Sequence, residues 1–325
     1  MNHFIEEIKK RGYTPYYHTL VPAIEWNQMI NQCLDVSFYF SSEMINYEIE
    51  KYKSSSDAYE AVIFQRKEMF FLFKIYFTEN INYVFPIRFS DNFEYVQGLQ
   101  ITKLYSKYLK SISYNIIFNK LPFTNPLQEA FNLDFLIGKN AHPTLELFTD
   151  LRLPLKSIWQ TIRTSYKSII NKSKNDFMVE NNCSPETWKE CKRLHKKVSE
   201  RQTRSDATWD IQFEMVKTGL AKVFYVCKGD EIIGFSLFYI SNKIITYAVG
   251  AYDRNLFKDF PISHILIWNA IEFFKEKQFD FLYLGDEQFQ SIKPDKKLDN
   301  INHFKKGFAN YYINTFSVSN PIKLD

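Results

Sequence analysis

The sequence predicts a protein of the α/β (α+β) class, built from two similar units in which a mixed sheet is flanked by helices. The stronger evidence is residues 221–286. There, three runs rich in β-branched and aromatic residues, separated by turn residues, precede a helical stretch and a fourth such run. The region 59–118 repeats this order in a rougher form. A strand, a helix and a further strand in this order form a crossover between parallel neighbours. We therefore expect a duplicated architecture, with domains at 1–144 and 145–325.

The N-terminal half begins with helices and continues as a strand meander. Its expected helices have apolar residues at helical spacing and cover 2–11, 22–33, 41–53 and 99–111. Its expected strands cover 34–40, 59–65, 69–77, 83–89, 114–118 and 131–137. Ser and Pro residues indicate a loop at 54–57 and a loop with a short helix at 121–131.

The C-terminal half opens with a strand at 145–151 and the clearest helix of the chain, at 155–174, where apolar residues recur every three or four positions. Ser184 followed by Pro185 predicts the N-cap and first turn of the next helix. Further helices are expected at 206–218, 261–277 and 302–308. The expected strands cover 221–227, 232–240, 244–253, 279–286 and 311–318.

Composition limits the classes of function. The 325 residues are 45% hydrophobic and 24% charged, as in ordinary globular proteins. The net charge of +4 does not predict a DNA partner, but it tolerates an anionic ligand. The four cysteines lack CxxC spacing, so we expect free thiols in a reducing compartment. The sequence shows no signal peptide and no apolar run long enough for a transmembrane segment, which predicts a cytoplasmic location.

Several common chemistries lack their motifs. The glycines are too scattered for GxGxxG or a phosphate loop ending in GK[ST], and no serine lies in a GxSxG elbow. HExxH and paired CxxC are also missing from the sequence. We therefore expect neither a metal enzyme nor a Ser or Cys hydrolase.

The first candidate group is a basic segment between two predicted helices. Arg201 and Arg204, with Ser205 and Asp206 and just before Trp209, could form a clamp for a phosphate or carboxylate, because guanidinium groups match both anions. The alternative is a solvated interhelix loop.

The second group lies at the end of the third predicted strand, where crossover sheets bind ligands. Tyr252, Asp253 and Arg254 occupy that end, and the Asp253 carboxylate could accept a proton from an amine. The alternative is an aspartate that only shapes a turn.

Two further groups follow. His264 lies in the first turn of the expected helix 261–277, where backbone N–H groups attract anions; the alternative is a packed histidine. Lys305 and Lys306, between Phe304 and Phe308 and considered together with Asp286 and Glu287, could hold a phosphate or stack on a base; the alternative is an amphipathic last helix with exposed lysines.

Several segments of the second half also occur in a recognisable order. They are Thr149 to Lys174 with Ile158-Trp159, Thr203-Arg204-Ser205 to Trp209, Gly250-Ala251-Tyr252-Asp253, Trp268, Phe279-Asp280 to Leu284-Gly285, and His303 to Phe308. Their order and spacing, over about 145–310, resemble FemAB-like proteins of the GNAT superfamily. The segment 203–209 resembles a subgroup met among surface-polysaccharide genes.

The resemblance implies two tandem GNAT-like domains and an acyltransferase that moves an aminoacyl or acyl group to an amine on a cell-envelope precursor. It implies aminoacyl-tRNA or acyl-CoA as the donor and no tightly bound cofactor. CoA-dependent GNAT enzymes carry a Gly-rich turn before the crossover helix. The corresponding segment here, Arg254 to Pro261, contains no glycine. This departure favours a tRNA ester or another activated donor.

The leading hypothesis assigns roles on this basis. Asp253 deprotonates the acceptor amine, Tyr252 and His264 line the pocket, and the cations Arg201, Arg204 and Lys305 bind an anionic, amine-bearing acceptor. That acceptor would be a nucleotide-linked or a lipid-linked precursor. A lipid-linked precursor would bring the protein into peripheral contact with a membrane. Two alternatives remain open: an acyl-CoA-dependent N-acetyltransferase acting on an amino sugar, and a non-catalytic module that binds a nucleotide sugar or RNA.

Overall fold

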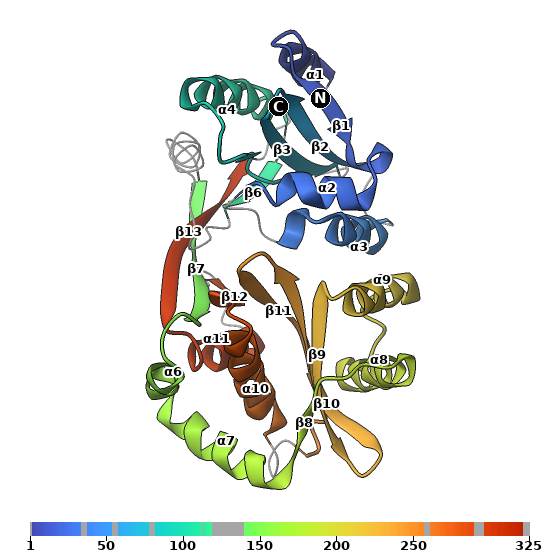
Figure 1. The fold of residues 1–325 in the computed structure, drawn as a ribbon, viewed down its shortest axis with the longest axis vertical. Coiled ribbons are helices and arrows are strands. Elements are labelled where there is room, and N and C mark those ends of the chain that lie inside the picture. The colour runs from blue at the N-terminus through green and yellow to red at the C-terminus, as the bar shows by residue number, and fades with distance from the viewer. Residues whose placement is uncertain are drawn as a thin grey trace. The chain divides into compact units, whose positions relative to one another are not determined.

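The computed structural model describes residues 2–33, 38–53, 58–77, 82–112, 114–118, 140–256, 261–288 and 296–320. The chain divides into two compact units, Met1–Thr144 with Ile313–Asp325, and Leu145–Tyr312 (Figure 1). It enters the second unit within strand β7 (Asn140–Asp150) and leaves it within β13 (Tyr311–Asn320). Residues 313–320, which the sequence places in the C-terminal domain, belong to unit 1 because β13 pairs there with β6 (Tyr114–Phe118).

Unit 1 is a mixed sheet covered by helices. Its strands lie in the order β1-β2-β3-β4-β6-β13, and β5 also pairs with β3. β4 and β6 are parallel neighbours joined through α4, as the crossover pattern predicts. The elements are α1 (Asn2–Lys9), β1 (Thr14–Tyr17), α2 (Ala23–Ile30), α3 (Ser42–Tyr52), β2 (Ala58–Arg66), β3 (Met69–Phe77), β4 (Asn82–Val84), β5 (Arg88–Phe89) and α4 (Tyr95–Leu109), with 3-10 turns at His18–Leu20 and Phe38–Phe40.

Side chains of β3 point alternately to the two faces of the sheet and contribute to a hydrophobic core on each face. Phe71 and Phe73 pack in one cluster with residues of α1 and α4, including Tyr105. Phe70 and Leu72, which point to the other face of the sheet, pack with residues of α2 and α3. Both faces of this strand are therefore buried, which explains its unbroken apolar sequence.

One strand predicted in unit 1 is wrong where the structure describes it. Residues 38–40 form a 3-10 turn, and the indole of Trp26 donates a 2.9 Å hydrogen bond to the Phe40 carbonyl. The apolar residues 38–40 thus lie in a turn that packs against the sheet and do not form one of its strands. The rest of that predicted strand, the loop at 54–57 and the predictions over 121–137 lie outside the described residues.

Unit 2 follows the predicted order of a three-strand meander, a helix and a strand. Its strands lie in the order β7-β12-β11-β10-β9-β8, and β11 pairs with β12 in parallel, as expected. The elements are α6 (Leu155–Thr161), α7 (Thr164–Asp176), β8 (Val179–Glu180), α8 (Pro185–Ser199), α9 (Asp206–Lys217), β9 (Ala221–Lys228), β10 (Glu231–Ser241), β11 (Ile244–Tyr252), α10 (Ile262–Glu276), β12 (Phe281–Gln288) and α11 (Lys296–Lys306).

The helix predicted at 155–174 is two helices, because the chain turns at Ile162 and Arg163 (Figure 1). The Arg163 amide donates to the Gly307 carbonyl at 3.0 Å, and its guanidinium donates to the His303 carbonyl at 2.9 Å. Both carbonyls lie at the end of α11, where a helix leaves backbone acceptors unsatisfied. The break is therefore a tertiary contact that helical periodicity does not encode.

The predicted cap of α8 is confirmed. Ser184 is its N-cap and accepts a 3.1 Å hydrogen bond from the Thr187 amide, and Pro185 occupies the first turn. None of the helices in the described part of the chain is both long and apolar enough to cross a membrane.

Candidate functional site

Strands β11 and β12 separate partway along unit 2. They pair through three residue pairs, from Ile244 opposite Phe281 to Thr246 opposite Tyr283. On the other side of β11, the register with β10 shifts so that Ala248 has no partner, which is a β-bulge. A bulge bends its strand and takes one residue out of the ladder. The bulge thus accompanies an opening at the carboxyl ends of two parallel strands, where ligands bind in crossover sheets.

Hydroxyl groups from β10 and β11 gather around the bulge. The Tyr247 and Tyr252 hydroxyls lie 2.8 Å apart, and Ser236 Oγ lies 3.1 Å from the Tyr252 hydroxyl. Burial raises the pKa of both tyrosines, so they stay protonated and can donate hydrogen bonds. A Cβ atom at Gly250 would overlap both phenol oxygens, so this hydroxyl cluster requires glycine at that position.

Lys305 lies against β12 on the other side of the opening. A Cβ at Gly285 would lie 2.5 Å from Lys305 Nζ, and Gly285 has a φ of +104°, which glycine adopts without strain. Burial lowers the pKa of the Lys305 ammonium, and the carboxylates of Asp286 and Glu146 oppose that shift. Its chain neighbour Lys306 instead forms a 2.6 Å ion pair with Glu287.

Glu146 of β7 completes this group. Its side chain is buried, and the Tyr283 hydroxyl donates a hydrogen bond to it. Burial raises the pKa of Glu146 to about 7, the Tyr283 hydrogen bond opposes that shift, and the Asp286 charge adds to it. Glu146, Asp286 and Lys305 thus form an electrostatically linked group beside the opening. We refer to them as the acid–base cluster.

Glu146 makes stability depend on pH in a defined direction. Its folded-state pKa is raised, so ionisation disfavours the folded state increasingly from about pH 4.5 to about pH 7, and fully above that. Glu146→Gln should therefore be about 2–3 kcal/mol more stable than the wild type at pH 8 and nearly equal to it at pH 5. Urea unfolding at the two pH values checks this. An equal difference at both pH values contradicts the assignment.

Asp253, the predicted base, forms a different set of contacts. Lys197 of α8 donates a 2.7 Å hydrogen bond to Asp253 Oδ2, and the Asn255 amide donates to Oδ1 at 3.0 Å. The Lys197 hydrogen bond lowers the pKa of Asp253, so it stays a carboxylate. The second bond forms the turn foreseen as the alternative. Arg254 is exposed in that turn, and residues 257–260 lie outside the described residues.

The predicted anion clamp is largely engaged within the protein. The Arg204 guanidinium donates to Gln212 at 2.9 Å and lies 4.9 Å from the centre of the buried Trp209 ring. Ser205 caps α9 by accepting a hydrogen bond from the Thr208 amide. Arg201 is exposed, and its carbonyl accepts a bond from Ser199. These contacts stabilise the junction of α8 and α9.

His264 is packed among aromatic rings. Its ring lies 4.3 Å from that of Tyr166 and 5.2 Å from that of Phe304. Nδ1 lies 3.2 Å from the Pro261 carbonyl oxygen, which implies that Nδ1 carries the proton. Burial lowers the pKa of His264 to about 4, so the ring is neutral at pH 7. Through Phe304, this packing fixes the helix turn that carries Lys305.

Glu146 and Tyr283 are not among the site residues that the sequence predicts. A signal existed for Glu146, because it interrupts the apolar run Leu145-Glu146-Leu147-Phe148, and a charge at such a position needs a partner. Tyr283 carried no such signal, since tyrosine is common in strands. No cluster of three or more His, Cys, Asp or Glu side chains able to hold a metal occurs within the described ranges.

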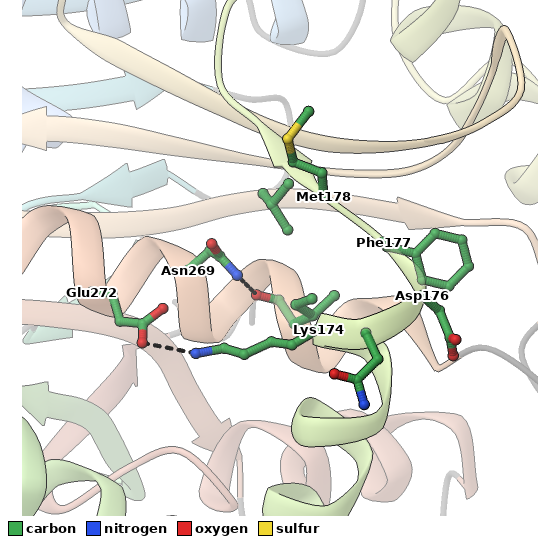
Figure 2. Close-up of a pocket in the computed structure, with 9 residues that line it drawn as sticks. Lys174, Asp176, Phe177, Met178, Asn269 and Glu272 are labelled. Carbon is green, nitrogen blue, oxygen red and sulfur yellow. Dashed lines mark hydrogen bonds and ion pairs between the residues drawn. The ribbon is translucent and has the colours of Figure 1, made fainter.

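A second cleft of unit 2 lies beside α10 (Figure 2). It has a volume of about 510 Å³ and is lined from the end of α7, from β8 and from one face of α10. Lys174 and Glu272 form a 3.0 Å ion pair across it, and Asn269 donates to the Ile265 carbonyl. Its Lys174 and Glu272 charges are thus paired with each other.

Comparison with known proteins identifies the fold. No protein-family model matches the chain, and no curated protein is similar to it in sequence. The crystal structure of FemX is similar at a TM-score of 0.65 and 11% identity, covering 93% of this chain and 96% of FemX. The L-PGS of Bacillus licheniformis is similar at a TM-score of 0.60 and 13% identity, covering 93% of each chain.

A tandem GNAT protein from the clavulanic acid biosynthesis pathway is also similar, at a TM-score of 0.51 and 9% identity, covering 95% of this chain and 98% of that one. All three matches span nearly the whole chain, so they include both units. The predicted architecture is thereby confirmed: this chain has the tandem GNAT-like fold that FemX and L-PGS share.

Proposed function

We propose that this chain is an acyltransferase that moves an aminoacyl or acyl group from an activated ester or thioester to an amine on a cell-envelope or surface-polysaccharide precursor. The observation that carries the proposal is the acid–base cluster beside the separated ends of β11 and β12. The fold shared with FemX and L-PGS supports it. The sequence resemblance to FemAB-like proteins, which includes the segment around Lys305, supports it independently.

The proposed step is direct attack of the acceptor amine on the donor carbonyl. A C–N bond forms, the C–O or C–S bond breaks, and the nitrogen loses a proton. Lys305 in its neutral form takes that proton, and Asp286 and Glu146 stabilise the resulting ammonium. The proton then passes to the leaving oxygen or sulfur. Holding both reactants in the opening supplies much of the rate, because alignment alone is worth about 7–11 kcal/mol.

The protein's other groups have supporting roles in this proposal. The hydroxyls of Tyr247 and Tyr252 orient the donor. Asp253, already a carboxylate paired with Lys197, orients the acceptor's neutral amine by accepting a hydrogen bond and does not take its proton. The donor we favour is aminoacyl-tRNA, because Arg254 to Pro261 contains no glycine to bring backbone amides to a pyrophosphate. The acceptor is a nucleotide- or lipid-linked amino sugar or peptide.

A transfer assay with paired donors tests the function. The chain is incubated with radiolabelled aminoacyl-tRNA or acetyl-CoA and with UDP-linked amino sugars or lipid-linked precursors, and amide formation is measured. We expect transfer from aminoacyl-tRNA to one of these amines. Transfer from acetyl-CoA but not from aminoacyl-tRNA would show that the donor is acyl-CoA and not the aminoacyl-tRNA proposed here. Binding of an acceptor, seen as a rise in melting temperature, without transfer from either donor would contradict the enzyme proposal and favour a binding module.

A further inference from the structure

Unit 1 contains a basic cleft that the proposed function does not use. The cleft has a volume of about 270 Å³ and lies between the end of α1, the end of β2 and the first turns of α4. Its polar lining consists of basic, amide and phenol side chains: Lys10, Arg11, Tyr13, Arg66, Gln97 and Gln100. The cations come from two segments far apart in the sequence, so the fold, and not a local charge run, brings them together.

The guanidinium groups keep much of their binding capacity. Within the described ranges, neither Arg11 nor Arg66 forms an ion pair with a carboxylate. Lys10 pairs with Glu7 at 2.8 Å, and that pair is exposed. A guanidinium offers five N–H donors and no acceptor, so Arg66, which interacts with Tyr13 but forms no such ion pair in the described part of the chain, still has donors for an anion in the cleft.

The floor of the cleft holds these groups in place. Tyr13 is 4% exposed, and its hydroxyl donates a 2.9 Å hydrogen bond to Gln97. The Arg66 guanidinium lies 5.9 Å from the centre of the Tyr13 ring. Gly12 lies beside the Arg66 side chain, and a Cβ built on this glycine would be 3.7 Å from Arg66 Nε. The first turn of α4 adds backbone N–H groups with partial positive charge, although Glu94, bonded to Gln97, opposes them in part.

We propose that this cleft binds the phosphate group of a small molecule. Three cations suit a phosphate monoester, which carries about −1.5 to −2 charge near pH 7, better than a singly charged carboxylate. The volume admits a phosphate with a small organic group but is below the range of about 300–1,000 Å³ that is usual for drug-sized ligands. This site is separate from the acid–base cluster, which lies in unit 2.

Calorimetric titration of the full chain in chloride buffer tests the site, with inorganic phosphate, glycerol phosphate and acetate as probes. We expect both phosphates to bind, and acetate to bind at least about tenfold more weakly. Arg11→Gln and Arg66→Gln should each weaken phosphate binding about tenfold or more, because each removes charge-assisted hydrogen bonds. Lys103→Gln, a matched change at an exposed lysine of α4 outside the cleft, should leave it unchanged.

The melting temperature of each variant without phosphate shows whether it folds. If Arg66→Gln melts as the wild type and binds phosphate equally well, the site is wrong. Equal binding of acetate and phosphate overturns the ligand class. Equal weakening by Lys103→Gln shows general charge attraction only, and also overturns the proposal. Binding of glycerol phosphate but not inorganic phosphate supports the site and shows that the organic group contributes.

Discussion

Replacing Lys305 with methionine is expected to lower the rate of transfer by at least about a hundredfold, because a positioned general base contributes about 10²–10⁴ to a rate. Methionine keeps the length and apolar character of the side chain and removes only the amine. The fold should be retained, since the lysine lies beside an opening and is only partly buried. Single-turnover kinetics with the donor identified by the transfer assay measure the effect on the chemical step.

Two further variants separate proton transfer from simple charge. Lys306→Met removes the neighbouring lysine, which is paired with Glu287 and not with the acid–base cluster, and should change the rate less than about threefold. Lys305→Arg keeps the positive charge but does not deprotonate in proteins, so it should be nearly as slow as Lys305→Met. An active Lys305→Arg enzyme would show that the positive charge is sufficient and would contradict the base assignment.

The pH profile follows from the same cluster. The Asp286 carboxylate raises the pKa of Lys305 against the effect of burial. Asp286→Asn should therefore lower the pKa of Lys305 further and move the rising limb of the rate to lower pH. Lys305→Met should lose that limb altogether. If the limb stays in the same place in Asp286→Asn, another group is titrating.

The sheet of each unit could be predicted because strand and turn signals are local. The run from Ala221 to Tyr252 alternates strand-forming residues with turns, and β9, β10 and β11 match the prediction closely. The parallel pairing of β11 with β12 followed from the helix between them. The break at Arg163 could not be predicted, since its cause is a carbonyl of Gly307, which is distant in the sequence.

The candidate site was harder to predict than the sheets, because the sequence gives the type of each residue but not the residues that it contacts in the fold. Arg204 and Asp253 have the chemistry expected of a site, but Gln212 and Lys197 engage them within the fold. Lys305 was among the predicted site residues, but its electrostatic link to Glu146 connects positions 159 apart in the chain. Only the assembled sheet brings β7, β12 and α11 together in unit 2.

Removing the Glu48 side chain is expected to destabilise unit 1 by about 3–5 kcal/mol, because it leaves a buried ammonium without its counter-charge. Lys74 of β3 is fully buried, and its Nζ donates to Glu48 at 2.9 Å and to the Tyr39 carbonyl at 2.6 Å. The Tyr59 hydroxyl donates to the same Glu48 oxygen at 2.9 Å. Glu48→Ala thus removes the acceptor of both Lys74 and Tyr59, and differential scanning calorimetry should show a large fall in melting temperature.

The same helix offers a matched control. Glu50 of α3 pairs with Lys53 at 3.8 Å, and the lysine is 76% exposed, so Glu50→Ala should change the stability by less than about 1 kcal/mol. A Glu48→Ala variant no less stable than Glu50→Ala would show that the Lys74 ammonium is not charged or not buried in solution. Both variants remove one carboxylate from one helix, so their difference isolates burial.

The double variant Glu48→Gln/Lys74→Met distinguishes the two ways in which a buried ion pair can matter. Removing both charges avoids the unpaired ammonium, so the double variant should be at least about 2 kcal/mol more stable than the sum of the single changes predicts. Recovery to wild-type stability would mean that the pair contributes little net free energy. Its contribution would then be specificity, because only one placement of α3 on the sheet lets Glu48 reach Lys74 between the Phe40 and Phe85 rings.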